Sequence, residues 1–328
     1  MKKYRSLLAV AVAVPVASLI LTSCGNDNSE VSTAGSSSLN VVATTNVYGQ
    51  IARAIGGDSV NVSEIITSAA QDPHSYEPTT RDKLTVSEAA IVVANGGGYD
   101  PFMDSLVQSL PSEQAGGVEL IHAVDTSPVA EEHEGESAEE HEEHADHEDE
   151  DSHDHAAYNE HIWYDLDSMS ALADELSKDF GDADSANKDQ YAKNAEDFKE
   201  GIKNLQTQLA DAKLEGKTFV GTEPVPFHLL EDAGMKNSTP AGLSEAIEEG
   251  EGIAPMTLKK AQDQLQGAKV DALAYNVQTE GNETKLLKKD AEEGKVPVVD
   301  FAETIQDDSS YLDWMKSNIS NLASAING

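Results

Sequence analysis

One long helical pattern divides this chain into two halves that follow the same plan. Apolar side chains recur at helical spacing from about Ala186 to Lys213, a length of about 40 Å at 1.5 Å per residue. On both sides of this pattern, short apolar strands alternate with helices, which is typical of mainly parallel sheets. The chain of 328 residues is also too long for one ordinary domain. These features predict an α/β fold with two lobes, each containing a mainly parallel sheet, joined by one long rigid helix.

The predicted strands locate the two lobes in the sequence. Strands are expected at residues 39–43, 60–66, 90–94 and 118–121 in the first half, and at 218–221, 270–275 and 296–299 in the second. Helical patterns occupy the intervals between them. We therefore expect a first lobe at 39–182, a connecting helix at 183–214 and a second lobe at 215–328.

The N-terminus has the pattern of a lipoprotein signal. Basic residues precede an apolar run from Leu7 to Leu21, which is short for a membrane span. The run ends in Leu21-Thr22-Ser23-Cys24, which resembles a bacterial lipobox, and Cys24 is the only cysteine, so no disulfide is possible. We expect residues 1–24 to be the signal and lipid on Cys24 to anchor the protein to the outer face of the cytoplasmic membrane. Residues 25–38, in which Gly, Ser, Asn and Thr are prominent, predict a flexible tether.

The net charge of -38 limits the possible partners. A nucleic-acid phosphate backbone would be repelled by this chain, and the sequence contains no strong basic patch. Excess acid suits a protein that handles cations, although solubility explains most acidic proteins.

A histidine-rich acidic segment follows the first four predicted strands. Between Glu131 and His155, six histidines occur among fourteen acidic residues, without lysine, arginine or any aliphatic residue larger than alanine. Residues 131–157 therefore predict a disordered loop. Acidic residues alone would make a solvated linker, but repeated imidazoles add many weak sites for a borderline divalent ion. His141 and His144 are three residues apart, whereas the helical zinc-hydrolase motif needs four. We expect this loop to collect metal.

Loops stiffened by proline present candidate ligands in both halves. The segment Asp72-Pro73-His74-Ser75-Tyr76-Glu77-Pro78 follows a predicted strand, and its prolines exclude a helix or central strand there. Loops at strand ends carry ligands in open α/β sheets, which makes His74 a candidate. His161 lies in an aromatic segment, where a structural core histidine is an equally good interpretation. In the second half, the loop Thr222 to His228 and the strand-end residue Asp300 offer further ligand-type side chains.

From Leu39 onward, the chain resembles the substrate-binding proteins of zinc and manganese ABC transporters. The resemblance rests on Asp72-Pro-His74-Ser-Tyr-Glu-Pro-Thr, Glu160-His161-Ile-Trp163, Thr222-Glu223-Pro followed by Gly234, and Val298-Val-Asp300. It implies two α/β lobes that clasp a divalent ion beside one long helix. It also implies one metal ligand from each stretch, namely His74, His161, Glu223 and Asp300.

The residue at position 223 bears on the identity of the ion. Zinc-type members of the family usually have a third histidine there, whereas two histidines with two carboxylates resemble the manganese type. His228 is a possible substitute five residues on. Any N/O site prefers zinc over manganese by the Irving–Williams order, and two imidazoles with two carboxylates form a neutral four-coordinate zinc centre. The histidine-rich insertion looks like that of zinc importers, so we expect Zn²⁺ as the transported ion and Mn²⁺ as the alternative.

The resemblance implies a monomeric, non-enzymatic protein that delivers its ion to an ABC permease. Two other classes remain open at this point. A secreted zinc hydrolase would need an open coordination position and a general base, and four protein ligands leave no such position. A surface adhesin or metal buffer would have the same fold without a transporter.

Overall fold

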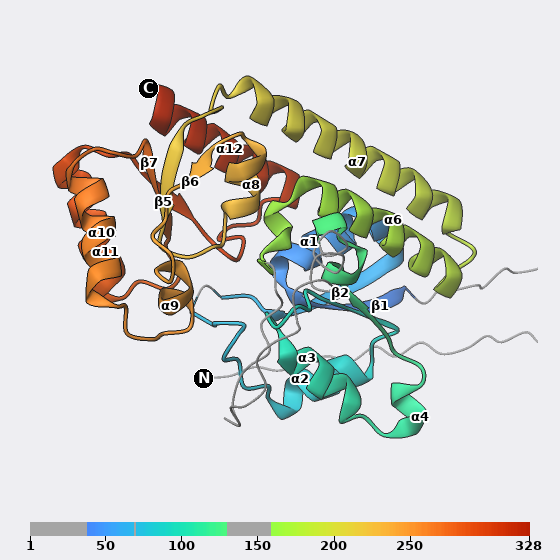
Figure 1. Cartoon of the computed structure of the whole chain (residues 1–328). Coiled ribbons are helices and arrows are strands. Elements are labelled where there is room, and N and C mark those ends of the chain that lie inside the picture. The colour runs from blue at the N-terminus through green and yellow to red at the C-terminus, as the bar shows by residue number, and fades with distance from the viewer. Residues whose placement is uncertain (1–37, 69, 130–158) are drawn as a thin grey trace, which may run out of the picture. The chain divides into compact units, whose positions relative to one another are not determined.

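The computed structural model describes residues 38–68, 70–129 and 159–328 (Figure 1). The described residues form one compact unit. The signal segment with Cys24, the predicted tether up to residue 37 and the histidine-rich loop lie outside the described residues. Within the described ranges, no helix is both long enough and apolar enough to cross a membrane.

The first sheet contains four parallel strands in the order β2-β1-β3-β4. The strands are β1 (Leu39–Thr45), β2 (Val60–Ile66), β3 (Ile91–Ala94) and β4 (Glu119–His122). In register, Val41 of β1 lies between Val62 of β2 and Ile91 of β3. All four residues of β3 are buried, which is expected of a central parallel strand covered on both faces. The carboxyl ends of these strands therefore share one edge of the sheet.

The second sheet repeats this arrangement, in the order β6-β5-β7-β8. Its strands are β5 (Thr218–Gly221), β6 (Lys236–Asn237), β7 (Ala272–Asn276) and β8 (Val298–Phe301). The two sheets have the same connectivity. In each, the first strand in the sequence is an inner strand, the second lies on one side of it, and the third and fourth lie on the other side. The predicted class, two α/β lobes with parallel sheets, is confirmed.

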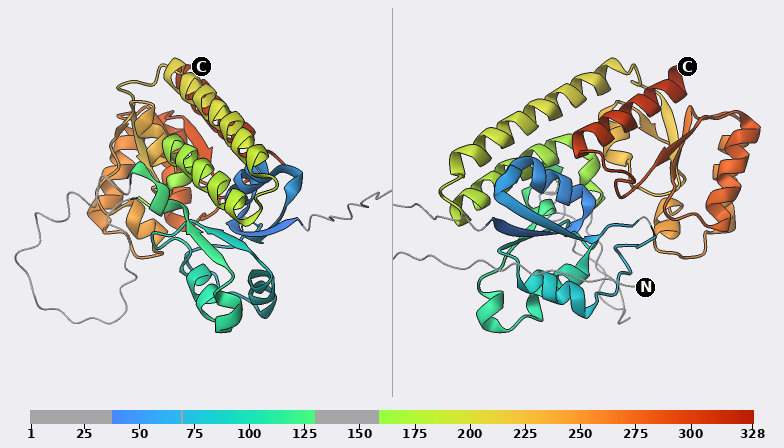
Figure 2. Two further views of the ribbon diagram at one scale, coloured as in Figure 1. Left: turned by 90° about the vertical axis from the view of Figure 1, so that its right-hand side faces the viewer. Right: turned by 180° about the vertical axis from the view of Figure 1, so that it is seen from behind.

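Helices cover the sheets in both lobes (Figures 1 and 2). In the first lobe they are α1 (Asn46–Gly56), α2 (Thr80–Ser87), α3 (Pro101–Gln108), α4 (Ser112–Ala115) and α6 (Leu166–Ala183), with 3-10 turns at Gly57–Ser59, Ala123–Thr126 and Ile162–Tyr164. In the second lobe they are α8 (Phe227–Asp232), α9 (Ser244–Glu248), α10 (Pro255–Gln266), α11 (Asn282–Gly294) and α12 (Tyr311–Asn327).

The predicted connecting helix is α7 (Lys188–Asp211), which has 24 residues. Its buried stripe contains the apolar residues that the sequence places at helical spacing, Tyr191, Phe198, Ile202, Leu205 and Leu209. The helix packs against α6 and α1 of the first lobe and also against α12, which runs beside it from the second lobe (Figure 2). The lobes are therefore joined by a layer of helices in which α12 reinforces α7.

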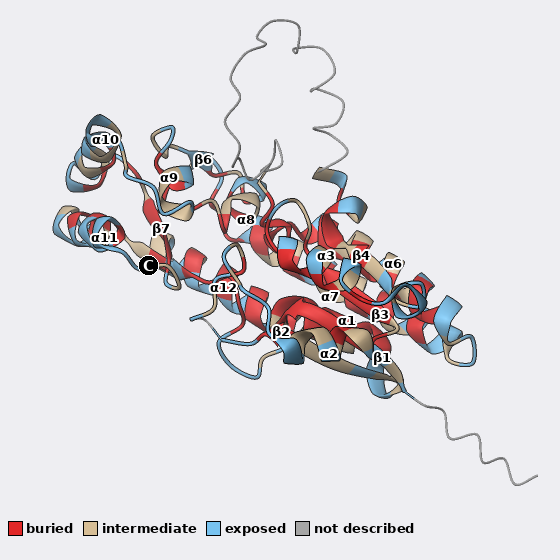
Figure 3. Cartoon of the chain, turned by 90° about the horizontal axis from the view of Figure 1, so that it is seen from below, coloured by how far each residue is buried: buried red, intermediate tan, exposed pale blue. Residues whose placement is uncertain are grey.

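The two lobes also share a hydrophobic core (Figure 3). One cluster of buried side chains continues from the first sheet through α6 and α7 to α12 and β8. Buried hydrogen bonds cross the same boundary: the Tyr311 hydroxyl donates to the Trp163 carbonyl at 2.9 Å, and the Tyr164 hydroxyl donates to the Ala302 carbonyl at 2.9 Å. Relative motion of the lobes would expose apolar surface, which opposes a wide hinge opening.

One strand boundary matters for the site. The sequence predicts that the last strand ends at Val299, but β8 continues to Phe301. Asp300 therefore lies inside the strand, between buried neighbours, and its own side chain is exposed. Side chains within a strand point to one face of the sheet or the other. The first side chains of this segment that can lie at the carboxyl edge of the sheet therefore belong to residues after Phe301.

Candidate metal centre

A short turn holds His74 in the loop between β2 and α2. The Asp72 carboxylate accepts hydrogen bonds from the His74 amide at 3.0 Å and from the Ser75 hydroxyl at 2.6 Å. The loop then enters α2 through a capping box formed by Thr79 and Asp82. These local contacts fix the backbone on both sides of the His74 imidazole.

His161 enters the same space from the segment that leads into the 3-10 turn Ile162–Tyr164. It is only 1% exposed. The Asn159 side-chain oxygen lies 3.1 Å from the His161 amide nitrogen and 2.7 Å from the His161 Nδ1 atom. The His74 and His161 rings are 6.2 Å apart between centroids, and Tyr99 packs edge-on against both. The structure thus brings the two predicted histidine ligands together.

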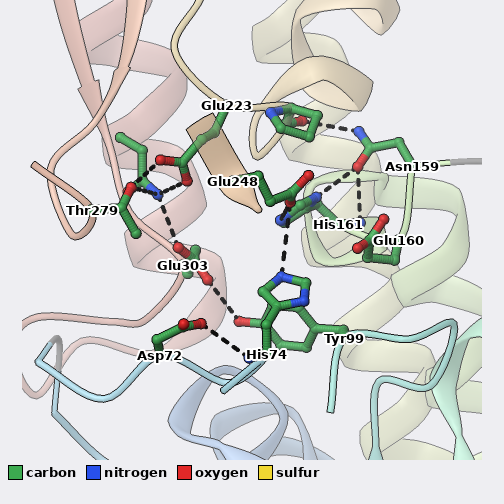
Figure 4. A network of polar contacts seen from close by, with 12 residues as sticks. Asp72, His74, Tyr99, Asn159, Glu160, His161, Glu223, Glu248, Thr279 and Glu303 are labelled. Atoms are coloured by element: carbon green, nitrogen blue, oxygen red, sulfur yellow. Dashed lines mark hydrogen bonds and ion pairs between the residues drawn. The ribbon is translucent and has the colours of Figure 1, made fainter. Parts of the chain in front are cut away.

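Glu248 on α9 completes a group of three donors with the two imidazoles (Figure 4). Its Oε1 atom lies 3.2 Å from His161 Nε2 and 3.8 Å from His74 Nε2. Ligand atoms of the three residues all lie within 4.8 Å of one another. The Glu248 oxygen is buried and has no hydrogen-bond partner among the described residues. A small cation between these atoms would satisfy all three.

Burial and charge both perturb the protonation of this group. Burial, followed by the charges of Glu160, Glu223, Glu303 and Glu249, raises the pKa of Glu248 to about 9. Burial, followed by the neighbouring His74, lowers the pKa of His161 well below its usual value. Near neutral pH, the site without an ion therefore holds a neutral His161 and a protonated Glu248.

A second set of carboxylates lies on the second-lobe side of the centre (Figure 4). Glu223 follows β5 and Glu303 follows β8. The Asn276 side-chain amide, at the end of β7, donates to Glu223 at 2.6 Å and to Glu303 at 2.9 Å. The Thr279 hydroxyl donates to Glu223, and the Tyr99 hydroxyl donates to Glu303 at 3.1 Å across the lobe boundary. These bonds hold two acidic side chains close together in a buried site.

The pKa values of these two carboxyl groups are raised as well. Burial is the main cause for both. The charge of Glu223 is the next cause for Glu303, whose pKa rises to about 7. Asp72 raises the pKa of both groups from the first-lobe side. The charged forms of these carboxyl groups therefore repel one another, and a dication bound between them would relieve that repulsion.

The structure does not bring Asp300 to this centre. Its side chain is 59% exposed and lies 3.5 Å from the Lys288 ammonium of α11. The cause is the length of β8, which places Asp300 within the strand and Glu303 just beyond its carboxyl end. His228 lies nearer, but its Nε2 atom is 2.8 Å from the Asn159 carbonyl oxygen. That contact occupies one of its two ring nitrogens.

Sequence reasoning missed Glu248 and Glu303. Ligands lie just beyond strand ends in such sheets. If the predicted strand had ended at Phe301 and not at Val299, this rule would have indicated Glu303 as a candidate ligand. Glu248 belongs to an acidic segment that reads as ordinary surface, from Glu245 to Glu251. Nothing in its local sequence distinguishes it from its neighbours, because its role depends on where α9 packs.

A small cavity gives access to His74 and Glu248. Its volume is about 200 Å³, and it is lined by Asp72, His74, Ser75, Gly98, Pro101, Glu248 and Glu249. Three of these residues are acidic, so the approach favours cations.

Two α/β lobes with a buried, acidic, histidine-containing centre between them define a binding protein for a metal cation. A family model described as "Zinc-uptake complex component A periplasmic" (ZnuA) matches residues 41–325. The chain belongs to this family.

Individual relatives agree with that assignment. The chain is 26% identical to the metal ABC transporter substrate-binding lipoprotein ScbA of Streptococcus cristatus, over 99% of each chain. It is 24% identical to the zinc-binding lipoprotein AdcA of Streptococcus pneumoniae, over 76% of this chain and 46% of AdcA. Its fold is similar to that of the substrate-binding protein FpvC of Pseudomonas aeruginosa in complex with Mn²⁺, with a TM-score of 0.67, 20% identity and coverage of 88% of this chain and 98% of FpvC. The protein is thus a substrate-binding component of a metal ABC transporter and not an enzyme.

Proposed function

We propose that this protein captures one Zn²⁺ ion between its lobes and delivers it to an ABC permease. The observation that carries the proposal is the convergence of His74, His161 and Glu248, whose ligand atoms lie within 4.8 Å of one another. Imidazole nitrogen and carboxylate oxygen are ordinary zinc ligands.

The proposed ligand set takes nitrogen from one lobe and oxygen from the other. His74 and His161 supply two nitrogen atoms, and Glu248 supplies the nearest oxygen. Glu223, predicted as a ligand from the sequence, and Glu303 are the carboxylates available to complete the shell, and Glu303 takes the place that the sequence suggested for Asp300. Their oxygen atoms accept hydrogen bonds from Asn276, Thr279 and Tyr99.

Zinc is preferred over manganese on chemical grounds, and manganese is the second candidate. A site with two imidazoles and carboxylates binds zinc more tightly by the Irving–Williams order, and the histidine-rich segment supplies weak sites of the same kind. The excess of carboxylates, however, also suits a harder ion such as Mn²⁺. The similar proteins include one named as zinc-binding and one whose structure is in complex with Mn²⁺.

The protein is proposed to act at the outer face of the cytoplasmic membrane as a monomer. Support comes from the lipobox-like sequence that ends at Cys24 and from relatives that are named lipoproteins. Lipid on Cys24 would keep the lobes close to the permease. The histidine-rich loop would raise the local ion concentration near the tight site.

Competitive metal loading tests the proposal. Protein without its signal is incubated with equimolar Zn²⁺ and Mn²⁺, desalted and analysed by mass spectrometry for bound metal. We expect one tightly bound Zn²⁺ per chain, and none in a variant that carries both His74→Ala and His161→Ala. Deletion of residues 131–157 should leave the tight site intact in calorimetry. Loss of tight binding on that deletion would mean that the loop is the principal site.

A further inference from the structure

Asn159 makes four hydrogen-bond contacts at the boundary between the lobes, and Figure 4 draws those of its side chain. Its side-chain nitrogen donates to the Pro224 carbonyl at 2.9 Å. Its side-chain oxygen contacts the His161 amide at 3.1 Å and His161 Nδ1 at 2.7 Å. Its own carbonyl contacts His228 Nε2 at 2.8 Å. One residue therefore joins the first-lobe ligand His161 to the second-lobe segment that follows Glu223.

These contacts fix the orientation of the Asn159 amide. A backbone carbonyl oxygen only accepts hydrogen bonds, so the group that faces Pro224 must be the NH₂ of Asn159. The amide hydrogen of His161 is only a donor, so the group that faces it must be the oxygen of Asn159. The two requirements agree, and the reversed amide would fail both.

The same logic fixes the tautomer of His161. The Asn159 oxygen has no hydrogen to give, so His161 Nδ1 must carry the proton at their 2.7 Å contact. A neutral imidazole has one proton on nitrogen, which leaves the lone pair on Nε2. That atom is the one that lies 3.2 Å from Glu248 and belongs to the three-donor group.

We propose that Asn159 is a positioning residue that holds His161 in the metal-ready tautomer and ties that tautomer to the contact between the lobes. The proposal rests on the function proposed above. Partners of this kind orient histidine ligands in metal sites, and their loss typically costs about 10- to 100-fold in metal affinity. Here the partner also donates to the Pro224 carbonyl of the opposite lobe, so displacement of the Pro224 segment would remove one of the two backbone contacts that orient the Asn159 amide. His228 supports the arrangement from α8 through the Asn159 carbonyl.

Two substitutions separate the two contacts of the side chain. Asn159→Asp keeps an oxygen acceptor for His161 Nδ1 but loses the donor to Pro224, whereas Asn159→Ala loses both. We expect Zn²⁺ affinity to fall about 10- to 100-fold in Asn159→Ala and to remain within about threefold of wild type, or to become tighter, in Asn159→Asp, whose added charge attracts the cation. Asn194→Ala is the matched control, because Asn194 also bridges distant segments through its side chain, at 2.8 Å to the Ile55 carbonyl, away from the centre.

The tautomer itself gives a readout that does not depend on metal. Long-range ¹H–¹⁵N spectra of the ion-free protein, with the His161 signals assigned by their loss in His161→Gln, should show the Nδ1-protonated form in wild type and Asn159→Asp. Asn159→Ala should show a mixture. Equal losses of affinity in both Asn159 variants, or an unchanged tautomer in Asn159→Ala, would overturn the proposal. If wild type showed the fixed tautomer but bound no Zn²⁺ or Mn²⁺, the proposed function would fail and the orientation of His161 would stand.

Discussion

The two sides of the metal centre are built in different ways. The first lobe contributes imidazoles, and each histidine contacts the residue two positions before it in the chain: the Asp72 carboxylate accepts from the His74 amide, and the Asn159 oxygen contacts the His161 amide and Nδ1. The second lobe contributes carboxylates from three separate segments, Glu223, Glu248 and Glu303, which meet only in the folded chain. The first side is determined locally, while the second is acidic and depends on tertiary packing.

This difference explains why the centre favours a cation. The buried His161 imidazole needs no counter-charge, because burial lowers its pKa and favours the neutral form. On the carboxylate side, burial disfavours the charged form of each acidic group, and neighbouring carboxylates repel one another. Together these effects raise the pKa values of Glu248 and Glu303 to about 9 and about 7. In the ion-free protein, protons neutralise this side, and a dication that binds there must displace them.

Removal of an imidazole should have the largest effect on binding. His161→Ala deletes a proposed ligand from the imidazole side, and we expect Zn²⁺ affinity to fall more than about 100-fold, beyond the loss typical of a residue that only orients a ligand. Calorimetry with a competing chelator measures the change. His122→Ala is the control, since His122 is a first-lobe histidine that pairs with Asp104 at 3.2 Å outside the centre. Similar losses in both variants would indicate a general defect of the lobe.

Removal of a charge from the acidic side should weaken binding and stabilise the ion-free protein. Glu248→Gln keeps the shape of the side chain but removes its repulsion with Glu160, Glu223 and Glu303. We expect affinity to fall by about 10- to 100-fold at pH 9, while the melting temperature without metal rises. Glu245→Gln, an exposed position on the same helix, should change neither quantity. A fall in both quantities would assign Glu248 a structural role.

The pH dependence should reflect proton displacement from Glu248. Its pKa is about 9 in the folded protein against an ordinary 4.5, so the folded state binds the extra proton between these values. Stability of the ion-free protein therefore falls as pH rises from about 4.5 to about 9. Zn²⁺ binding should strengthen about tenfold per pH unit over the upper part of this window. Calorimetry in buffers of different ionisation enthalpy should detect proton release at pH 7, and its absence would place the ion elsewhere.

The smallest effect is expected at Asp300. Because its carboxylate faces Lys288 and solvent, Asp300→Asn should change Zn²⁺ affinity less than about threefold, as expected of an exposed pair. Glu303→Gln serves as the comparison and should weaken binding more. A large loss in Asp300→Asn alone would restore the ligand set expected from the sequence.

The same contrast shows what the sequence could predict. His74 and His161 lie in short segments whose prolines, aromatic residues and spacing are visible in the chain, and the structure brings them together. The parallel sheets and α7 follow from periodicity, which is a strong signal in long elements. Asp300 and Glu303 depend on where β8 ends, and a strand end is defined by pairing with β7 more than by local sequence. Glu248 depends on the placement of the short helix α9 and had no local signal.

The central claim is that one divalent ion binds between the lobes with ligands from both. Anomalous diffraction from crystals loaded with one equivalent of Zn²⁺ tests it most directly. We expect one strong peak about 2.0–2.1 Å from the Nε2 atoms of His74 and His161, with carboxylate oxygen from the second lobe at about 2.0–2.2 Å. Peaks found only outside this centre, with the two imidazoles free of metal, would contradict it.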